Sequence, residues 1–278
     1  MITTIVNGIA TDQISVKDRA LNYGDGVFET IAVQTNKLYY WAEHYRRLKA
    51  GCERLGIAAP AEATLLTDIT KLSFTEASSV VKIIVSRGQG GRGYASDPQN
   101  QPTVIISNNL WPDYVESYQQ QGITVRLCQH RLLINPALAG IKHLNRLDQV
   151  LARSEWQNNM IQEGLMLDQN DNIVEGISSN VFMKINKQWL TAPDSHCAVA
   201  GVMREAVLRR AAKAGLQITQ RHVHQSELPL IEQMFVCNSI WGIVPVRACE
   251  SYEFKSADDI KRLQTELEQD TKSAPYVI

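Results

Sequence analysis

The sequence lacks the features that mark nucleic-acid, membrane or exported proteins. Its 278 residues carry 28 basic and 29 acidic side chains, a net charge of -1, so bulk charge indicates neither a nucleic-acid nor a membrane partner. No segment is long and apolar enough to span a bilayer. The first residues lack a basic region and a long apolar core, so we expect no signal peptide. With 44% hydrophobic and 21% charged residues, the composition is that of a soluble globular protein in which any anion site is local.

Cysteine is scarce and scattered, with five residues and no Cys-X-X-Cys pair. An odd number at irregular spacing argues against a disulfide framework and favours the reduced thiols of a cytoplasmic protein. His222 and His224 lie on one side of an expected strand. No third metal ligand follows nearby in sequence, so we expect no bound metal.

The pattern of elements is mixed α+β, and the chain is long enough for two domains. Residues 108–113 are rich in turn formers. We therefore predict a small domain at residues 1–108, an interdomain loop at 109–114 and a larger domain at 115–278. The expected strands are 3–6, 27–33, 80–86, 103–107, 122–128, 164–168, 180–185, 218–223 and 234–237, and the expected helices are 42–55, 61–72, 144–160, 202–214 and 258–271.

Lys142 stands just before the expected helix at residues 144–160, with the apolar residues Ile141 and Leu144 beside it. Loss of hydration lowers the pKa of a lysine, because it disfavours the ammonium form. A neutral amine is a nucleophile that reacts with carbonyl groups such as that of pyridoxal phosphate. The alternative is a lysine that buries its methylene groups and extends its charge to water. Local sequence favours this alternative, and other segments of the chain bear on the choice.

Residues 88–93 match the glycine pattern G-x-G-x-x-G after a strand-like run. In a dinucleotide-binding site this pattern opens a helix whose N-terminus faces the pyrophosphate. Here Tyr94 and the turn formers up to Pro98 follow instead. The segment is therefore interpreted as a flexible loop, or as a loop that closes over a site.

Several segments offer groups that suit a phosphate or a ring nitrogen, although each has an ordinary structural explanation as well. Arg47 follows His44 by one helical turn, so both side chains can face one way. The expected helix after Gly201 has free N–H groups at its start, and residues 237–242 combine a short strand with small polar residues. Glu175, flanked by turn residues, would hold a pyridine nitrogen protonated if it faced one.

Taken together, these segments resemble the fold-type IV pyridoxal-phosphate enzymes, the group of branched-chain and D-amino-acid aminotransferases and aminodeoxychorismate lyases. The resemblance runs nearly end to end, in family order around Lys142. It implies a small α/β sandwich domain, a larger barrel-like α/β domain and a homodimer that binds pyridoxal 5'-phosphate. The segments that carry it are residues 23–29, His44 with Arg47, 175–180 and 201–204.

The resemblance also implies roles for individual residues. Lys142 would bind the cofactor covalently and act as the general base. Glu175 would pair with the pyridine nitrogen, and the side chain of Arg47 would contact the phosphate. Backbone N–H groups would complete the phosphate site at Val202, Met203, Ser239 and Ile240.

Residues 140–151, 86–94 and 237–246 narrow the resemblance to the lyases of the group. Such a lyase converts 4-amino-4-deoxychorismate to 4-aminobenzoate and pyruvate in folate biosynthesis. The substrate has two carboxylates, so we expect Arg92 and Tyr94 to contact it, with Tyr23, Thr30 and Trp111 as walls. Some relatives carry an arginine at the position of Ala32, so their carboxylate contacts do not transfer directly.

Two other functions remain open at this point. The first is an aminotransferase on the same scaffold, because the segment from residue 23 onward suits a D-amino-acid enzyme almost as well. The second is a cofactor-carrying protein without catalysis. It would require loss of the lysine or of the acid that faces the ring nitrogen, and the sequence has both Lys142 and Glu175.

Overall fold

The computed structural model describes residues 2–91, 93–97, 99–255, 258–273 and 276–278. The chain divides into two compact units. The first comprises Met1–Pro112, Ile141–Asn145 and Ser273–Ile278, and the second comprises Asp113–Gly140 and Arg146–Lys272. Lys142 therefore belongs to the first unit, although the chain on both sides of its segment belongs to the second.

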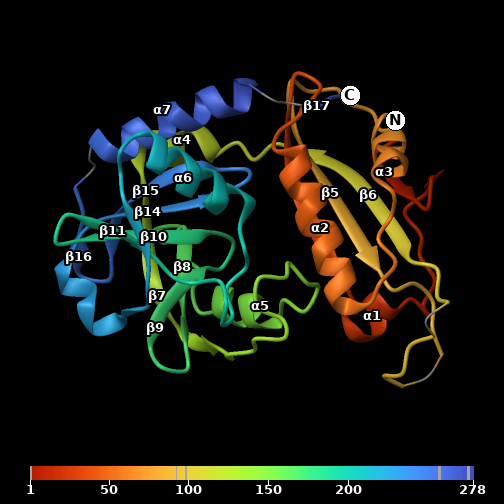
Figure 1. Ribbon diagram of the computed structural model, residues 1–278, viewed down its shortest axis with the longest axis horizontal. Helices are drawn as coiled ribbons and strands as arrows, with labels where there is room; N and C mark the ends of the chain where they lie inside the picture. Colours follow the sequence, from red (N-terminus) through yellow and green to blue (C-terminus); the bar gives the residue numbers. More distant parts are fainter. Residues whose placement is uncertain (1, 92, 98, 256–257, 274–275) are drawn as a thin grey trace. The chain divides into compact units, whose positions relative to one another are not determined.

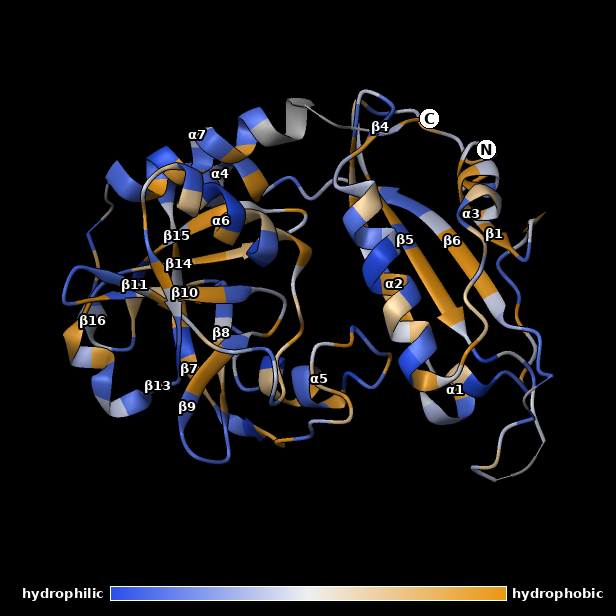
Figure 2. Ribbon diagram, viewed as in Figure 1, coloured by the Kyte–Doolittle hydropathy of each residue, from blue (hydrophilic) through white to orange (hydrophobic). Residues whose placement is uncertain are grey.

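The first unit is built on a seven-stranded sheet with the order β17-β4-β3-β5-β6-β1-β2. Its three long central strands pair antiparallel, and Figure 2 shows hydrophobic residues along β5 and β6. The strands are β1 (Thr4–Val6), β2 (Ile9–Ala10), β3 (Gly26–Gln34), β4 (Lys37–Leu38), β5 (Ser78–Ser86), β6 (Thr103–Leu110) and β17 (Tyr276–Val277). The helices are α1 (Arg19–Tyr23), α2 (Trp41–Leu55) and α3 (Glu62–Ile69).

One face of this sheet forms the core of the unit. A cross-strand row runs through Ile83, Ile106 and Ile5, which are all buried. Glu29 of β3 pairs with Ile83 and so lies on the same face. Leu48 of α2 is buried in the same cluster, and α2 runs beside the central strands (Figure 1). An acid on this face needs partners, because burying an unpaired charge is costly.

The segment that carries Lys142 pairs with the start of β3 and does not begin a helix. The Phe28 N–H donates to the Lys142 carbonyl oxygen at 3.0 Å, and the Leu144 N–H donates to the Gly26 carbonyl oxygen at 2.9 Å. This pairing holds residues 142–144 extended. Helix α5 consequently begins only at Leu147 and ends at Arg153, so the expected helix at 144–160 was too long at both ends.

The second unit is a closed barrel with appended strands. Strands β10, β14, β15, β7, β8 and β9 follow one another in the sheet, and β9 pairs with β10 at Glu175 and Asn180, which closes the ring. These strands are β7 (Ile123–Leu132), β8 (Glu163–Asp168), β9 (Asn172–Gly176), β10 (Asn180–Ile185), β14 (Ile231–Asn238) and β15 (Gly242–Cys249). The appended strands are β11 (Gln188–Thr191), β12 (Ile218–Gln220), β13 (Val223–His224) and β16 (Tyr252–Glu253).

Helices cover parts of this barrel. In Figure 1, α6 lies beside β14, and α4 lies near β15. Phe182 of β10 stacks on Phe235 of β14 with 4.7 Å between ring centroids, and both rings are fully buried. The helices are α4 (Val115–Gln121), α5, α6 (Val202–Lys213), a 3₁₀ helix (Gln225–Leu230) and α7 (Asp258–Ser273).

The predicted fold class, a mixed α+β chain with a barrel-like larger domain, is confirmed by this architecture. Strand β15 was not expected, and it contains Pro245, although proline is rare inside a central strand. All five cysteines are free thiols. Within the described part of the chain, no helix is long and apolar enough to cross a membrane, and no His, Cys, Asp and Glu side chains form a cluster of three suited to a metal ion.

Candidate active site

In the first unit, Lys142 places its amine over the face of an aromatic ring. Its Nζ lies 4.3 Å from the ring centroid of Phe28, and its carbonyl oxygen is held by the Phe28 N–H. Ile141, the preceding residue, is buried in the sheet core. The backbone of the lysine is therefore held against β3 by this hydrogen bond, beside the buried side chain of Ile141.

Glu29 is a buried carboxylate shared by Arg47 and His44. Its two oxygens accept from Arg47 Nε at 2.8 Å and from Arg47 Nη2 at 2.6 Å, and Oε2 also lies 2.6 Å from His44 Nδ1. Helix α2 places His44 and Arg47 on one face, as the sequence predicted. The fork of hydrogen bonds orients the Arg47 guanidinium, the proposed contact of a phosphate.

Charge and burial set the protonation of this group. Burial raises the pKa of Glu29, but the charge of Arg47 and the hydrogen bonds of Arg47 and His44 outweigh burial and lower it to about 2. Burial lowers the pKa of His44 below its ordinary value, against the attraction of Glu29. Glu29 is thus ionised and His44 neutral at pH 7. The His44 Nε2 atom has no hydrogen-bond partner among the described residues.

Acid should unfold the protein partly through Glu29. Its carboxyl has a lower pKa in the folded than in the unfolded state, so its contribution to stability is complete above pH 4.5 and is lost as the pH falls towards 2. The shift corresponds to about 3 kcal/mol. In urea unfolding at several pH values, the free energy of unfolding of the wild type should fall over this pH range. That of Glu29→Gln should lack this part of the pH dependence. Glu227→Gln, which removes a more exposed partner of Arg221, should change the pH dependence by less than about 1 kcal/mol. An equal change in both variants would contradict this assignment.

In the second unit, Glu175 lies at the end of β9, where the barrel closes. Its side chain is buried, and Oε2 accepts from the Val199 N–H at 2.9 Å. Asn180, its partner across the closure, donates from Nδ2 to the Val199 carbonyl oxygen at 3.1 Å. Both polar groups of residue 199 are thus held by the two ends of one turn.

The residues that follow Val199 lead directly into helix α6. Gly201 is its N-cap and supplies no side-chain cap, so the N–H groups of Val202 and Met203 keep their capacity to bind an anion. A Cβ atom at Gly201 would lie 1.9 Å from Asn180 Oδ1, so only glycine fits there. The Asn180 side chain therefore packs directly against the backbone at the helix start.

Residues 238–241 form a turn after β14. Asn238 Oδ1 accepts from the Ile240 N–H at 2.9 Å and from the Trp241 N–H at 2.7 Å. The Ile240 N–H, a predicted phosphate donor, is therefore already engaged by a side chain that fixes its direction. Ser239 is half-buried and lies in the same turn.

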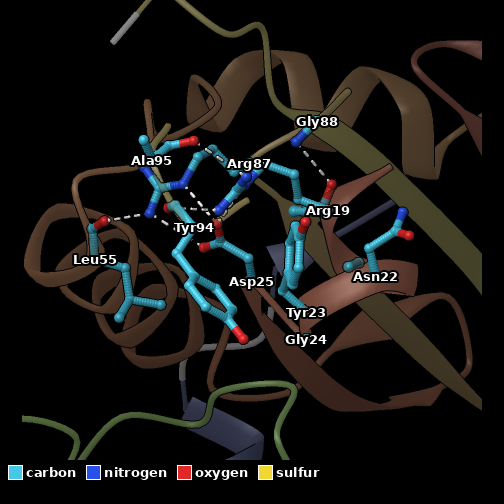
Figure 3. A network of polar contacts seen from close by, with 12 residues as sticks. Arg19, Asn22, Tyr23, Gly24, Asp25, Leu55, Arg87, Gly88, Tyr94 and Ala95 are labelled. Carbon is cyan, nitrogen blue, oxygen red and sulfur yellow. Dashed lines mark hydrogen bonds and ion pairs between the residues drawn. The ribbon is translucent and has the colours of Figure 1, made fainter. Parts of the chain in front are cut away.

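The glycine-rich loop is held by Arg19 in the first unit. Figure 3 shows the Arg19 guanidinium beside Tyr94 and Ala95, whose carbonyl oxygens accept from Nη2 at 3.1 Å and from Nη1 at 3.4 Å. Tyr23 supports the same loop, since its hydroxyl accepts from the Gly93 N–H at 3.1 Å and its ring lies 5.6 Å from that of Tyr94. The Tyr94 side chain is 89% exposed.

Comparison with known proteins shows the family of this chain. The sequence model of the amino-transferase class IV family matches residues 26–249. This chain belongs to the class IV aminotransferase family. The class IV chain is 32% identical over 263 residues to an aminodeoxychorismate lyase of Vibrio harveyi, with 95% of this chain and 97% of the relative covered. It is 26% identical over 248 residues to a putative branched-chain-amino-acid aminotransferase of Methanocaldococcus jannaschii, with 87% and 85% covered.

A solved structure is also similar to this chain in fold and sequence. The crystal structure of a 4-amino-4-deoxychorismate lyase from Pseudomonas aeruginosa superimposes on the class IV chain with a TM-score of 0.90. The two sequences are 40% identical, and the match covers 96% of this chain and 98% of that one. The family resemblance predicted from the sequence is therefore confirmed.

The structure places the other predicted residues of the class IV chain as follows. Thr30 lies two residues after Phe28 on β3, hence on the same face of the sheet, and is half-buried. Trp111 follows β6 and is half-buried. Arg92 lies outside the described residues. Lys142, Arg47, Tyr23, Tyr94, Thr30 and Trp111 belong to the first unit, and Glu175, Val202, Met203, Ser239 and Ile240 belong to the second.

Sequence reasoning assigned no role to Glu29, Arg19 or Asn238. For Glu29 a signal was present, because an acid within the mostly apolar run at residues 27–33 requires a buried partner. No comparable signal marks Arg19 or Asn238, whose carbonyl and N–H partners lie on turns that the sequence does not specify.

Proposed function

We propose that this class IV protein is a pyridoxal-phosphate-dependent lyase that converts 4-amino-4-deoxychorismate to 4-aminobenzoate and pyruvate in folate biosynthesis. The observation that carries the proposal is the nearly full-length similarity to two lyases, at 32% and 40% identity. The aminotransferase of Methanocaldococcus jannaschii is less similar, at 26% identity.

The residues present fit pyridoxal 5'-phosphate. The donor set suits a phosphate: the oriented guanidinium of Arg47, the start of α6, which has no side-chain cap, and the half-buried turn residue Ser239. Glu175 offers a buried carboxylate for the ring nitrogen. When bound, the cofactor supplies a carbonyl group for attachment and a ring that accepts electrons from the substrate.

Lys142 has two tasks in this proposal. Its amine would hold the cofactor covalently, and as a free amine it would remove the proton from the substrate carbon that bears the amino group. Loss of the enolpyruvyl group, which becomes pyruvate, leaves an aromatic ring, and aromatisation drives the reaction forward. Glu175 maintains a proton on the ring nitrogen, which strengthens the electron withdrawal that the reaction needs.

The substrate carries two carboxylates and a six-membered ring. We assign its carboxylates to Arg92 and to the exposed hydroxyl of Tyr94. Tyr23, Thr30 and Trp111 are proposed as walls. Because Arg19 and Tyr23 hold the glycine-rich loop by its backbone, the Tyr94 side chain is presented outward, where a ligand can reach it.

The proposal is tested by supplying purified protein with 4-amino-4-deoxychorismate. We expect 4-aminobenzoate and pyruvate in equal amounts, measured by chromatography and by a coupled pyruvate assay. The second candidate is an aminotransferase of the branched-chain or D-amino-acid type, favoured by the similarity to such enzymes. Turnover of amino acids with 2-oxoacids, without 4-aminobenzoate formation, would select it and reject the lyase.

We further propose that the protein is a cytoplasmic homodimer, as the family resemblance implies. Exposed apolar side chains support a partner surface, because monomeric proteins rarely expose them in groups. Leu147, Val150 and Leu151 are exposed and lie at the helical spacing that puts them on one face of α5. Sedimentation equilibrium should give twice the mass of the chain, and a monomer at micromolar concentration would refute the dimer.

A further inference from the structure

Glu163, the first residue of β8, is a buried acid that the proposed reaction does not use. Only 3% of it is exposed. Its Oε1 accepts from the N–H groups of Gly164 at 3.0 Å and Ile177 at 3.1 Å. Its Oε2 accepts from the Ser178 N–H at 3.3 Å, from Ser178 Oγ at 2.7 Å and from Ser179 Oγ at 3.2 Å. Nearly all of these donors belong to the turn between β9 and β10, so one carboxylate fixes that turn.

The turn held by Glu163 joins Glu175 to Asn180. It is closed by a hydrogen bond from the Gly176 N–H to the Ser179 carbonyl oxygen at 2.6 Å. A Cβ atom at Gly176 would lie 2.2 Å from Ser179 Oγ, so the turn is packed tightly. Its two ends, Glu175 and Asn180, hold the two polar groups of Val199 just before the start of α6. A shift of the turn would therefore move both the acid and the entry to that helix.

The same turn also reaches residues 238–241. The Ser178 carbonyl oxygen accepts from Asn238 Nδ2 at 3.2 Å. The other end of that amide, Oδ1, accepts the N–H groups of Ile240 and Trp241. Asn238 thus links the N–H groups of Ile240 and Trp241 to the turn that Glu163 fixes. The turn at residues 176–179 therefore connects Glu175, the start of α6 and the segment at 239–240.

We propose that Glu163 is a positioning residue for the cofactor site, and that it acts through the 176–179 turn on Glu175, on the start of α6 and on the segment at Ser239 and Ile240. This inference rests on the proposed function for the identity of the ligand. The connections themselves lie wholly within the second unit. Glu163 contacts none of the groups assigned to the cofactor, so its effect is indirect.

The substitution Glu163→Gln would test this role with little change of shape. The amide oxygen of the new side chain can still accept hydrogen bonds from the Gly164 and Ile177 N–H groups. Its NH₂ group would face the Ser178 N–H, which is also a donor, so this contact turns from attractive to repulsive. Ser178→Ala removes a single hydroxyl contact and serves as a milder second variant.

Asp168, the last residue of β8, provides a matched control. It is also buried, and its carboxylate accepts from the N–H groups of Asn170 and Asn172 in the turn at the other end of β8. Asp168→Asn therefore makes the same chemical change in the same strand. It acts on a turn that carries none of the assigned cofactor contacts.

Two measurements on the full chain decide the proposal. Amide hydrogen exchange without cofactor should be faster in Glu163→Gln at Val199, Ile240 and Trp241, and unchanged there in Asp168→Asn. Titration of cofactor-depleted protein with pyridoxal 5'-phosphate should show a dissociation constant raised about fivefold or more in Glu163→Gln, with a smaller rise in Ser178→Ala, and changed less than about twofold in Asp168→Asn.

Each outcome has a distinct meaning. Exchange and affinity at wild-type values in Glu163→Gln would overturn the positioning role, as would equal losses in Glu163→Gln and Asp168→Asn. If Glu163→Gln fails to fold, the same comparison between Ser178→Ala and Asp168→Asn decides. If the wild-type protein does not bind the cofactor, the proposed function fails, and the exchange data still decide whether Glu163 fixes the distant N–H groups.

Discussion

Replacing Lys142 with alanine should lower the formation of 4-aminobenzoate by more than about 10⁴-fold, because one side chain serves as attachment point and as base. The fold should persist. The hydrogen bond from the Phe28 N–H goes to the carbonyl oxygen of residue 142, and Ile141 supplies the core contact. Turnover by chromatography, together with a circular dichroism spectrum and a thermal midpoint, measures both effects.

Borohydride reduction followed by peptide mass spectrometry gives this test its control. In the wild type, the reduced adduct should lie on Lys142. Lys82 is the matched lysine, since its Nζ also lies over the Phe28 ring, at 5.6 Å from the centroid. Lys82→Ala should keep the adduct, and Lys142→Ala should lose it. An adduct that persists in Lys142→Ala would reject Lys142 as the attachment point.

Replacing Glu175 with glutamine should lower turnover by about 10²–10³-fold, the cost of removing one group that stabilises charge in a transition state. A neutral amide cannot hold a proton on the ring nitrogen as a carboxylate does. The amide oxygen can still accept from the Val199 N–H, so the barrel closure and the start of α6 should be preserved. Stopped assays with saturating cofactor would show the loss in kcat.

Glu155→Gln serves as the control for this variant. Glu155 is also a glutamate of the second unit whose carboxylate accepts backbone N–H bonds, from Gln129 at 2.9 Å and from His130 at 2.8 Å. It has no assigned role in the reaction, so its replacement should leave kcat within about twofold. If Glu175→Gln retains wild-type kcat, the pairing of Glu175 with the ring nitrogen is wrong.

Much of the fold was predictable because it follows from local patterns. Alternating apolar residues gave β3, whose odd-numbered residues Val27 to Val33 face the core, and helical spacing gave α2 and α6 nearly to their limits. Helix α5 was overestimated because residues 142–144 pair with β3, a contact between distant segments that no local pattern contains.

The candidate site was predictable in its residue types and much less in its connections. Lys142, Arg47 and Glu175 were found because they stand in segments that resemble a known family. The partners that orient them were not found. Glu163 pairs with a turn 14 to 16 residues away, and Asn238 bonds to Ser178 at a separation of 60 residues. A single sequence gives no information on such pairings.

The first unit is assembled from separate segments of the chain, and this affects the order in which it can fold during synthesis. Strand β17, Tyr276–Val277, pairs with β4 of the first unit, and Ile278 packs against its core. The segment Ile141–Asn145 also completes it. Protein domains generally acquire their structure in order of synthesis, N-terminal first. Here the sheet that begins with residues 4–110 stays incomplete until Tyr276 and Val277 have been translated, so its edge strand β17 can be added only after the barrel sequence has been synthesised.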